Sequence, residues 1–138
     1  MRVLALDHGA ARCGCAISDP TGTIVTPLPI VLRPDSGPGL TEIEHLARNH
    51  EAELVLIGLP LLQSGESGAQ AAAVRSFAGR LEGRIDVPVE LFDERFTTQM
   101  AQSSLAEGAT SEEDSLAAAH LLEDYLAQKI QTTDGTES

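Results

Sequence analysis

Hydrophobic residues in the first part of the chain fall into short runs that predict strands. Residues 2–7 (RVLALD) have the pattern of a buried strand that ends in an acid. Gly14–Ser18 and Thr23–Thr26 predict two further strands. The tetrapeptide Asp19-Pro20-Thr21-Gly22 between them has proline second and glycine fourth, which a type I turn prefers. The chain is therefore expected to open with a three-stranded meander.

Helical and strand patterns alternate over the rest of the chain. Residues 27–39 contain Pro27, Pro29, Pro34 and Pro38 and are expected to be irregular. Thr41 is expected to cap the first helix, with Glu44 completing a capping box. The later elements expected are a strand at 53–58, a loop at 60–68, a helix at 69–83, a strand at 88–93, a helix from Thr97 or Thr98 to Leu105, a helix capped by Ser111 and a disordered tail at 131–138.

Apolar positions spaced by three or four residues indicate which faces of the helices are buried. The expected inward residues are Leu40, Ile43, Leu46 and Ala47, then Ala73, Val74, Phe77, Ala78 and Leu81, and finally Leu116, Ala119, Leu122, Leu126 and Ile130. Strands that alternate with helices after a meander imply a mixed sheet with helices on its faces. The expected fold is thus α/β, with a mixed five-stranded sheet flanked by helices in a single domain at residues 1–130.

Composition limits the classes of protein that the chain can belong to. With 138 residues and 42% hydrophobic residues, it is long enough for one domain with its own core. It has no apolar run of about 18 residues, so no membrane span is expected. Met1-Arg2 leads straight into a strand without a signal-peptide pattern, and the expected location is the cytoplasm. Cys13 and Cys15 lie too close along one strand for an unstrained disulfide and are expected to be reduced and buried.

The net charge of −12 is unusual for a protein that binds nucleic acid, because such proteins generally carry a basic patch. Residues 1–50 hold four arginines and five acids, whereas residues 51–138 hold four arginines, one lysine and sixteen acids. Any contact with phosphates must therefore use a local arginine cluster, bound cations, or both.

Three acidic positions fall where the expected fold can bring them together. Asp7 ends the first strand, Asp93-Glu94 ends the last strand, and Asp114 lies in the first turns of the last helix. The carboxyl ends of parallel strands share one rim of a sheet, and ligands tend to bind there. Clustered carboxylates suit Mg²⁺ or Mn²⁺, and two such ions can activate water and stabilise the leaving oxygen in phosphodiester cleavage. Taken singly, each acid could equally be a solvated strand end or a partner for a helix dipole.

Two loops follow strands that end at this rim. In Asp7-His8-Gly9-Ala10-Ala11-Arg12, Gly9 allows the backbone to turn beside the carboxylate, and Arg12 can bind a phosphate through its forked guanidinium. His8 could donate to a phosphate or simply bond to a neighbour. The loop at 58–68 holds three glycines and can either wrap a ligand or make a plain connection.

Five segments, in this order, resemble the YqgF family, whose members are also called RuvX: LALDHGAARCGCAISD, VLIGLPLLQSGESG, VRSFAGRL, VPVELFDERFTT and DSLAAAHLLEDYL. The resemblance runs from about residue 2 to residue 127, and the DERFTT block with the last helix is its specific part. It implies an RNase H-like fold, divalent-metal hydrolysis of phosphodiester bonds, and 5′ trimming of precursor 16S ribosomal RNA. Resolution of four-way DNA junctions (Holliday junctions) is an older assignment to this family.

Transferred position by position, the resemblance implies that Asp7, Glu94 and Asp114 are the catalytic carboxylates and the ligands of Mg²⁺ or Mn²⁺. Asp93 is the less favoured ligand. The candidate nucleic-acid contacts are Gly9, Arg12, Arg95, Thr97 and Thr98. Arg95 could equally well form a structural salt bridge. Thr97 and Thr98 could equally well serve as helix N-caps.

The chain departs from the family pattern at two places. The family typically has an aromatic residue after the first acid, followed by Gly-Thr-Lys/Arg-Arg, where this chain has residues 8–12, HGAAR. Basic residues usually precede the acid of the last helix, where this chain has residues 110–113, TSEE. Both differences remove positive charge near the expected substrate path, so they bear on substrate affinity rather than on the metal site.

Three readings therefore remain besides a nuclease acting on precursor 16S rRNA. A DNA-junction resolvase would share the site but would need two active sites, hence a homodimer rather than a monomer. A ribosome-maturation factor that binds RNA with little turnover would fit the acidic charge. An actin-like ATPase also opens with an Asp-x-Gly motif, but the chain is too short for two lobes that close around ATP.

Overall fold

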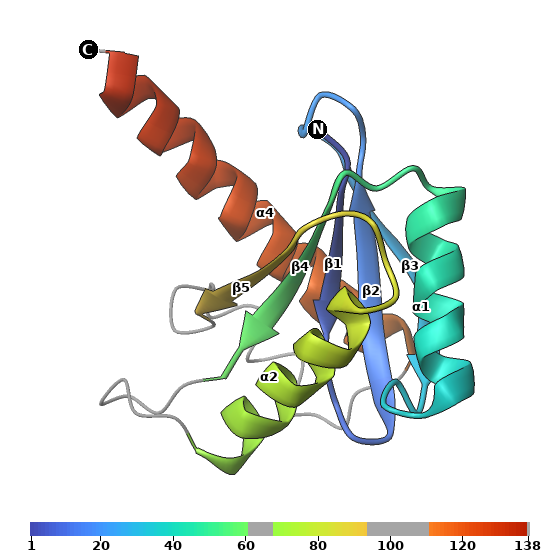
Figure 1. The fold of residues 1–138 in the computed structure, drawn as a ribbon. Helices are drawn as coiled ribbons and strands as arrows, with labels where there is room; N and C mark the ends of the chain where they lie inside the picture. The colour runs from blue at the N-terminus through green and yellow to red at the C-terminus, as the bar shows by residue number, and fades with distance from the viewer. Residues whose placement is uncertain (61–67, 94–110, 138) are drawn as a thin grey trace.

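The computed structural model describes residues 1–60, 68–93 and 111–137, and in the last helix it describes the side chains of residues 115–129. One five-stranded sheet runs through the molecule, with helices on both faces (Figure 1). The elements in chain order are β1 (Val3–Asp7), β2 (Arg12–Ser18), β3 (Val25–Leu32), α1 (Gly37–Asn49), β4 (Leu54–Leu59), α2 (Ala69–Glu82), β5 (Val89–Asp93) and α4 (Ser111–Glu137).

The sheet has the strand order β3-β2-β1-β4-β5. β2 is antiparallel to both β1 and β3, whereas β4 is parallel to both β1 and β5. The expected mixed five-stranded sheet in a single α/β fold is therefore confirmed. The opening meander supplies one side of the sheet, and the helical crossovers supply the other, as the alternation of patterns predicted.

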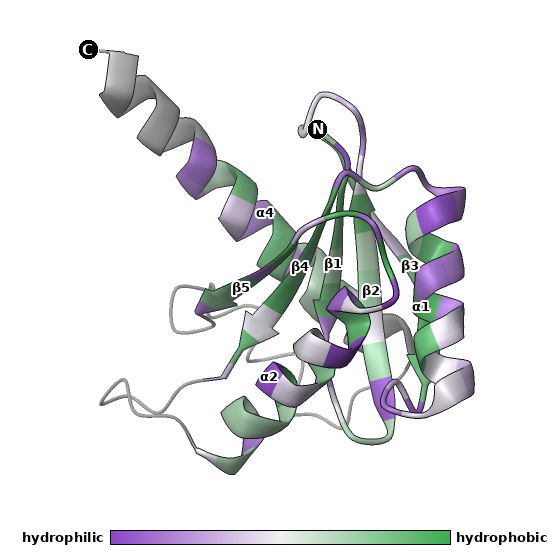
Figure 2. Ribbon diagram, in the orientation of Figure 1, coloured by the Kyte–Doolittle hydropathy of each residue, from purple (hydrophilic) through white to green (hydrophobic). Residues whose placement is uncertain are grey.

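Side chains alternate along β1 between two separate hydrophobic cores. Leu4 and Leu6 lie on the face that α1 and α2 cover, whereas Val3 and Ala5 lie on the face that α4 covers. All four are fully buried, as expected for a central strand that is covered on both faces. Figure 2 shows the same arrangement as hydrophobic colouring along the central strands and on the inner sides of the helices.

The third strand is longer than the sequence predicted. Residues 27–32 were expected to be irregular because of their prolines, but they belong to β3, where Pro27 pairs with Ala16. β3 has a neighbour on one side only, so a proline there does not have to remove a hydrogen bond from the ladder. The prolines therefore fit an edge strand, and the expectation of irregular structure at 27–32 was wrong.

The first helix begins earlier than expected. Ser36, and not Thr41, is the N-cap, and its hydroxyl accepts a hydrogen bond of 3.1 Å from the N–H of Gly39. Pro38 stands in the first turn, where its missing N–H leaves no intrahelical bond unmade. The expected inward face is largely confirmed, because Leu40, Ile43 and Ala47 are buried.

The inward faces of the other two helices differ slightly from the expected ones. In α2, Ala71 is buried whereas Ala73 is exposed, because Ala71 and not Ala73 continues the spacing of Val74, Ala78 and Leu81. In α4, Leu116 is 40% exposed, and the buried face consists of Ser115, Ala117, Ala118, Ala119, Leu121, Leu122 and Tyr125. This alanine-rich face allows close packing on β1, β2 and β3.

The end of α4 also differs from expectation. The helix continues to Glu137, through residues that the sequence assigns to a disordered tail. Adding residues to an existing helix is far easier than starting one, which gives a physical reason for the extension. The helix expected between Thr97 and Leu105 lies outside the described residues. No helix in the described part of the chain is long and apolar enough to cross a membrane.

Candidate active site

Asp7 lies at the end of a central strand, on a rim where three parallel strands end. β1, β4 and β5 run in the same direction, with Leu6 beside Ile57 and Leu59 beside Asp93. The β1–β2 turn and the starts of α1 and α2 lie at the same end of the sheet (Figure 1). This is the rim at which the ligands of open α/β sheets usually bind.

A cavity of about 530 Å³ opens at this rim. Its lining consists of Asp7, His8, Gly9, Ala10, Ala11, Arg12, Pro60, Gln70, Ala73 and Val74. The expected acid and the whole of its loop thus face one space, together with the first turns of α2. Gln70 was not expected from the sequence, because a single glutamine at a helix start carries no chemical signal of its own.

The two described acids at the strand ends fall on opposite faces of the sheet. Asp7 continues the alternation of Val3 and Ala5, which lie in the core beneath α4. On β5, Phe92 lies in that same core, so Asp93 falls on the face of α1 and α2. Strand alternation thus assigns Asp7 and Asp93, which the sequence could only assign to one rim, to rows that face opposite sides of the sheet.

The start of α4 is attached to the sheet near the level at which Asp7 ends β1. The hydroxyl of Ser115, which follows Asp114 in the chain, donates a hydrogen bond to the carbonyl of Leu28. Leu28 pairs with Cys15, and Cys15 pairs with Leu6. The start of α4 is thus attached to the sheet at the level of the residue before Asp7.

The other expected site residues fall outside the described part of the chain. Glu94, Arg95, Thr97 and Thr98 are outside the described residues, and so is the side chain of Asp114. Within the described residues, no group of three or more His, Cys, Asp or Glu side chains could hold a metal ion. The part of the site that the structure describes is therefore Asp7 with the other residues that line its cavity.

Local interactions fix the shape of the β1–β2 turn. A Cβ atom added to Gly9 would lie 2.7 Å from the carbonyl oxygen of Arg12, so the turn requires a glycine there. The ring of His8 packs 4.6 Å from that of Phe77, and its Nε2 lies 2.8 Å from Oδ2 of Asp35. This contact could not be predicted from the sequence, because the two residues are 27 positions apart along the chain.

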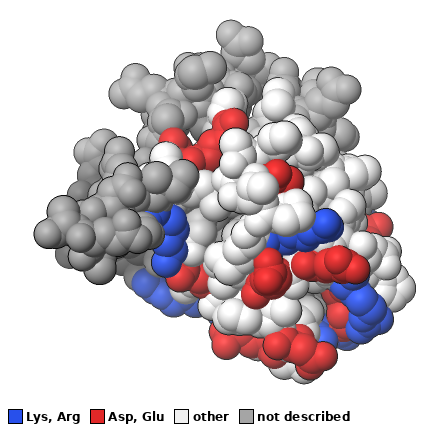
Figure 3. All heavy atoms as spheres, turned by 90° about the horizontal axis from the view of Figure 1, so that it is seen from above, with Lys and Arg blue, Asp and Glu red and all other residues white. Residues whose placement is uncertain are grey.

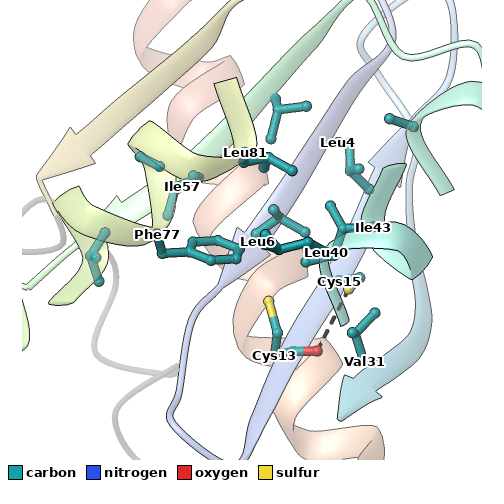
Figure 4. Close-up of a cluster of buried hydrophobic side chains, with 14 of the residues drawn as sticks. Leu4, Leu6, Cys13, Cys15, Val31, Leu40, Ile43, Ile57, Phe77 and Leu81 are labelled. Carbon is teal, nitrogen blue, oxygen red and sulfur yellow. Dashed lines mark hydrogen bonds between the residues drawn. The ribbon is translucent and has the colours of Figure 1, made fainter. Parts of the chain in front are cut away.

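The two cysteines lie on β2, which follows this turn, and are free, as expected (Figure 4). Both are fully buried among the side chains of α1 and α2. The pKa of the Cys13 thiol is raised well above its usual value, first by its hydrogen bond with Cys15 and then by burial. A thiol held in its protonated form is a poor nucleophile, which excludes Cys13 from the chemistry. Cys15 is fully buried and does not reach the cavity.

Charged side chains lie at both ends of the sheet. Figure 3, which views the end opposite to Asp7, shows acidic and basic side chains interspersed over that surface. At the Asp7 end, Arg12 lines the cavity, and Arg80 donates a hydrogen bond of 2.7 Å to the carbonyl of Asp35. Arginines on neighbouring elements therefore lie close to the candidate site.

Comparisons with known proteins agree with this arrangement. The family model for RuvX, described as a Holliday junction resolvase, matches residues 1–128. A protein of Moorella thermoacetica named "putative pre-16S rRNA nuclease" is 36% identical over 132 residues, which cover 91% of this chain and 94% of that protein. A protein of Sulfurihydrogenibium with the same name is 36% identical over 141 residues, covering 98% and 96% of the two chains.

Solved structures share the fold at low sequence identity. RuvC of Thermus thermophilus, in complex with a Holliday junction substrate, matches with a TM-score of 0.60 at 14% identity, covering 94% of this chain and 96% of RuvC. The Holliday junction resolvase of fowlpox virus matches with a TM-score of 0.53 at 12% identity, covering 93% and 99% of the two chains. The expected RNase H-like fold is thus confirmed by its likeness to RuvC. On the extent of the family match and the identity to its relatives, the chain belongs to the RuvX family, a family of nucleases.

Proposed function

We propose that this chain is a metal-dependent nuclease that processes the 5′ end of precursor 16S rRNA. The observation that carries the proposal is the position of Asp7, which ends a central parallel strand inside a cavity of about 530 Å³. A cavity with a carboxylate at the carboxyl end of the strands is a suitable place for a cation and a phosphate. The names of the similar proteins support RNA as the substrate.

The donor set fits Mg²⁺ or Mn²⁺, because both ions prefer the hard oxygen ligands that carboxylates provide. Asp7, Glu94 and Asp114 are the proposed ligands. Asp93 is the weaker candidate, since strand alternation puts it on the face opposite to Asp7. The hydrogen bond from Ser115 to Leu28 supports Asp114 as a ligand. It attaches the start of α4 to the sheet at the level of Leu6, the residue before Asp7. When bound, such ions activate water and stabilise the leaving oxygen.

The chain's own residues would position the nucleic acid. Gly9 leaves room for a backbone phosphate to approach the turn, and Arg12 borders the same cavity and can donate two parallel hydrogen bonds to phosphate oxygens. Arg95, Thr97 and Thr98 are proposed as further contacts. Asp7 would hold a cation at the end of β1, in the cavity that Arg12 borders.

Junction resolution remains a second candidate because the matched family model is described in those terms and the RuvC match was solved with junction DNA. It requires paired incisions and hence two active sites in a homodimer, whereas RNA trimming can be done by a monomer. The oligomeric state in solution therefore bears directly on the choice.

The test is a cleavage assay on a fragment of precursor 16S rRNA and on a synthetic four-way DNA junction, each with Mn²⁺, Mg²⁺ or EDTA. Wild type is compared with Asp7→Asn, Asp93→Asn and Glu94→Gln. Asp86→Asn is the matched control, because Asp86 is exposed and stands before β5, at the other end of that strand from Asp93. Each of these substitutions removes one carboxylate charge.

We expect the wild type to cleave the RNA only when Mn²⁺ or Mg²⁺ is present. Asp7→Asn and Glu94→Gln should abolish this cleavage, and Asp86→Asn should retain it. Loss of cleavage in Asp93→Asn but not in Glu94→Gln would mean that Asp93, and not Glu94, is the metal ligand. Symmetric cleavage of the junction would replace the RNA substrate by DNA. If neither substrate is cut while RNA still binds, the chain is a maturation factor and not a nuclease.

A further inference from the structure

Arg33 stands in a backbone conformation that residues with a Cβ atom rarely adopt. Its φ is 48°, in the left-handed region. Its N–H donates a hydrogen bond of 2.9 Å to the carbonyl of Ala11, and its own carbonyl accepts bonds of 3.0 Å and 2.7 Å from the N–H and the hydroxyl of Ser36. Such strain persists where surrounding contacts impose it, and it is concentrated at functional sites.

These bonds hold Arg33 at the edge of the cavity. Ala11, its hydrogen-bond partner, lines the cavity, and so does Arg12, whose partner across the strands is Leu32, the residue before Arg33. Arg33 itself is exposed. Two arginines are thus adjacent at the rim beside Asp7, one on β2 and one just after β3.

Within the part of the chain that the structure describes, no ion pair involves the guanidinium of Arg33. Arg48 and Arg84 each lie 3.8 Å from a carboxylate oxygen of Glu44, and Arg80 lies 4.0 Å from Oδ1 of Asp35. Of the arginines that the structure describes, only Arg33 has no hydrogen bond or ion pair from its guanidinium. In a chain with a net charge of −12, an unpaired arginine beside the cavity is a local source of attraction for an anion.

We propose that Arg33 binds a backbone phosphate of the RNA substrate next to the phosphate that is cleaved. The inference rests on the proposed function, since it assigns a further contact to the same site. An arginine fork matches phosphate geometry, and each neutralised phosphate releases counterions, so the contact contributes to a salt-dependent affinity. Arg33 thereby supplies positive charge that the Ala10-Ala11 segment of the neighbouring turn lacks.

The experiment compares Arg33→Asn with Arg33→Lys and with a control, Arg48→Gln. Asparagine tolerates the left-handed conformation, so Arg33→Asn removes the charge with the backbone retained. Arg48→Gln removes the same charge from α1, where Arg48 faces Glu44. The affinity of each variant for a labelled fragment of precursor 16S rRNA is measured in EDTA at several salt concentrations, and kcat and KM are measured with Mn²⁺. The melting temperature of each variant is recorded alongside.

We expect Arg33→Asn to weaken RNA binding by roughly three- to tenfold and to make the slope of log K against log salt shallower by about 0.7, as for the loss of one single-strand phosphate contact. KM should rise with kcat within about twofold, since a remote phosphate contact acts on binding. Arg33→Lys should keep most of the salt slope, and Arg48→Gln should match wild type.

Two results would overturn the inference. If wild type cleaves the RNA and Arg33→Asn behaves like Arg48→Gln in affinity and slope, Arg33 does not bind phosphate, although the proposed function stands. If wild type neither binds nor cleaves the RNA, the proposed function fails, and the role of Arg33 fails with it. A melting temperature close to that of wild type in Arg33→Asn rules out unfolding as the cause of weaker binding.

Discussion

The Nε2 atom of His8 lies 2.8 Å from Oδ2 of Asp35, and this contact joins the β1–β2 turn to the segment between β3 and α1. The His8 side chain is 6% exposed, whereas that of Asp35 is 42% exposed. The carboxylate therefore satisfies a buried ring nitrogen that has little access to water. It also connects the residue after Asp7 with the turn that carries Arg33.

We predict that Asp35→Ala destabilises the fold by about 1–3 kcal/mol, because it leaves a buried polar nitrogen without its partner. Equilibrium unfolding in urea measures the change. Asp35→Asn keeps an oxygen acceptor at the same position and should lose less than half as much. Equal losses in the two variants would mean that the ring does not depend on this bond.

Two glycines in the first turn of α1 provide a matched comparison. A Cβ atom on Gly39 would lie 2.1 Å from the carbonyl oxygen of Arg33, whereas one on Gly37 would meet nothing within 4 Å. Gly39→Ala must therefore displace the turn at Arg33, and we expect a loss of roughly 1–3 kcal/mol, in the range found for overpacked sites. Gly37→Ala should be neutral or slightly stabilising, since alanine favours a helix.

Urea unfolding of the two variants checks the size of the effect, and RNA binding checks its location. If Arg33 binds phosphate, Gly39→Ala should also weaken RNA binding at temperatures where the variant is fully folded. Gly37→Ala should leave the affinity unchanged. A Gly39→Ala protein as stable as wild type would show that the backbone at Arg33 adapts easily.

The strand and helix pattern was predictable from the sequence wherever burial alone decides it. The continuous apolar runs of β1 and β4 follow from their central places in the sheet. A local pattern does not show that β3 is an edge strand, so Pro27 and Pro29 by themselves predict a break in structure. The edge position depends on the strand order, which a local pattern does not contain.

The candidate site was predictable at Asp7 for a similar reason, because an acid that ends a buried strand stands out locally. Its surroundings were not. Asp35 and Arg33 reach the site through the fold of β3 onto β2, and Gln70 reaches it through the start of α2. No motif in the sequence around these residues indicates a role in the site. Only the three-dimensional structure shows that they lie near Asp7.

The buried cysteines make a prediction about reactivity. Both are fully buried, and the pKa of Cys13 is raised by its hydrogen bond with Cys15 and by burial. A thiol-specific disulfide reagent at pH 8 should therefore label the native protein no faster than the protein unfolds, while both thiols should react at once in urea. Rapid labelling of one thiol under native conditions would contradict the packing shown around them.

The turn between β2 and β3 predicts how stability depends on pH. The hydroxyl of Thr21 donates a hydrogen bond of 2.7 Å to Oδ2 of Asp19, and the backbone N–H groups of Thr23 and Ile24 donate to Oδ1. These bonds favour the ionised form, chiefly the one from Thr21, and lower the pKa of Asp19 from 3.8 to about 2. The N–H of Gly22 also bonds to the carbonyl of Asp19 at 3.0 Å, as expected for a turn of this sequence.

A carboxylate whose pKa is lowered by folding stabilises the folded state above its unfolded pKa and loses that contribution as the pH falls through its folded value. The contribution of Asp19 should therefore be complete above about pH 4 and disappear towards pH 2. We predict that Asp19→Asn melts at a lower temperature than wild type at pH 6 and that the difference vanishes near pH 2. Differential scanning calorimetry across this range measures it.

Thr21→Val provides the control for the cause of this effect. It removes the hydroxyl that donates to Asp19. At pH 6, Thr21→Val should therefore lower the melting temperature more when it is introduced into wild type than when it is introduced into Asp19→Asn. A difference between wild type and Asp19→Asn that stays constant from pH 6 to pH 2 would mean that the effect comes from the shape of the side chain and not from its charge.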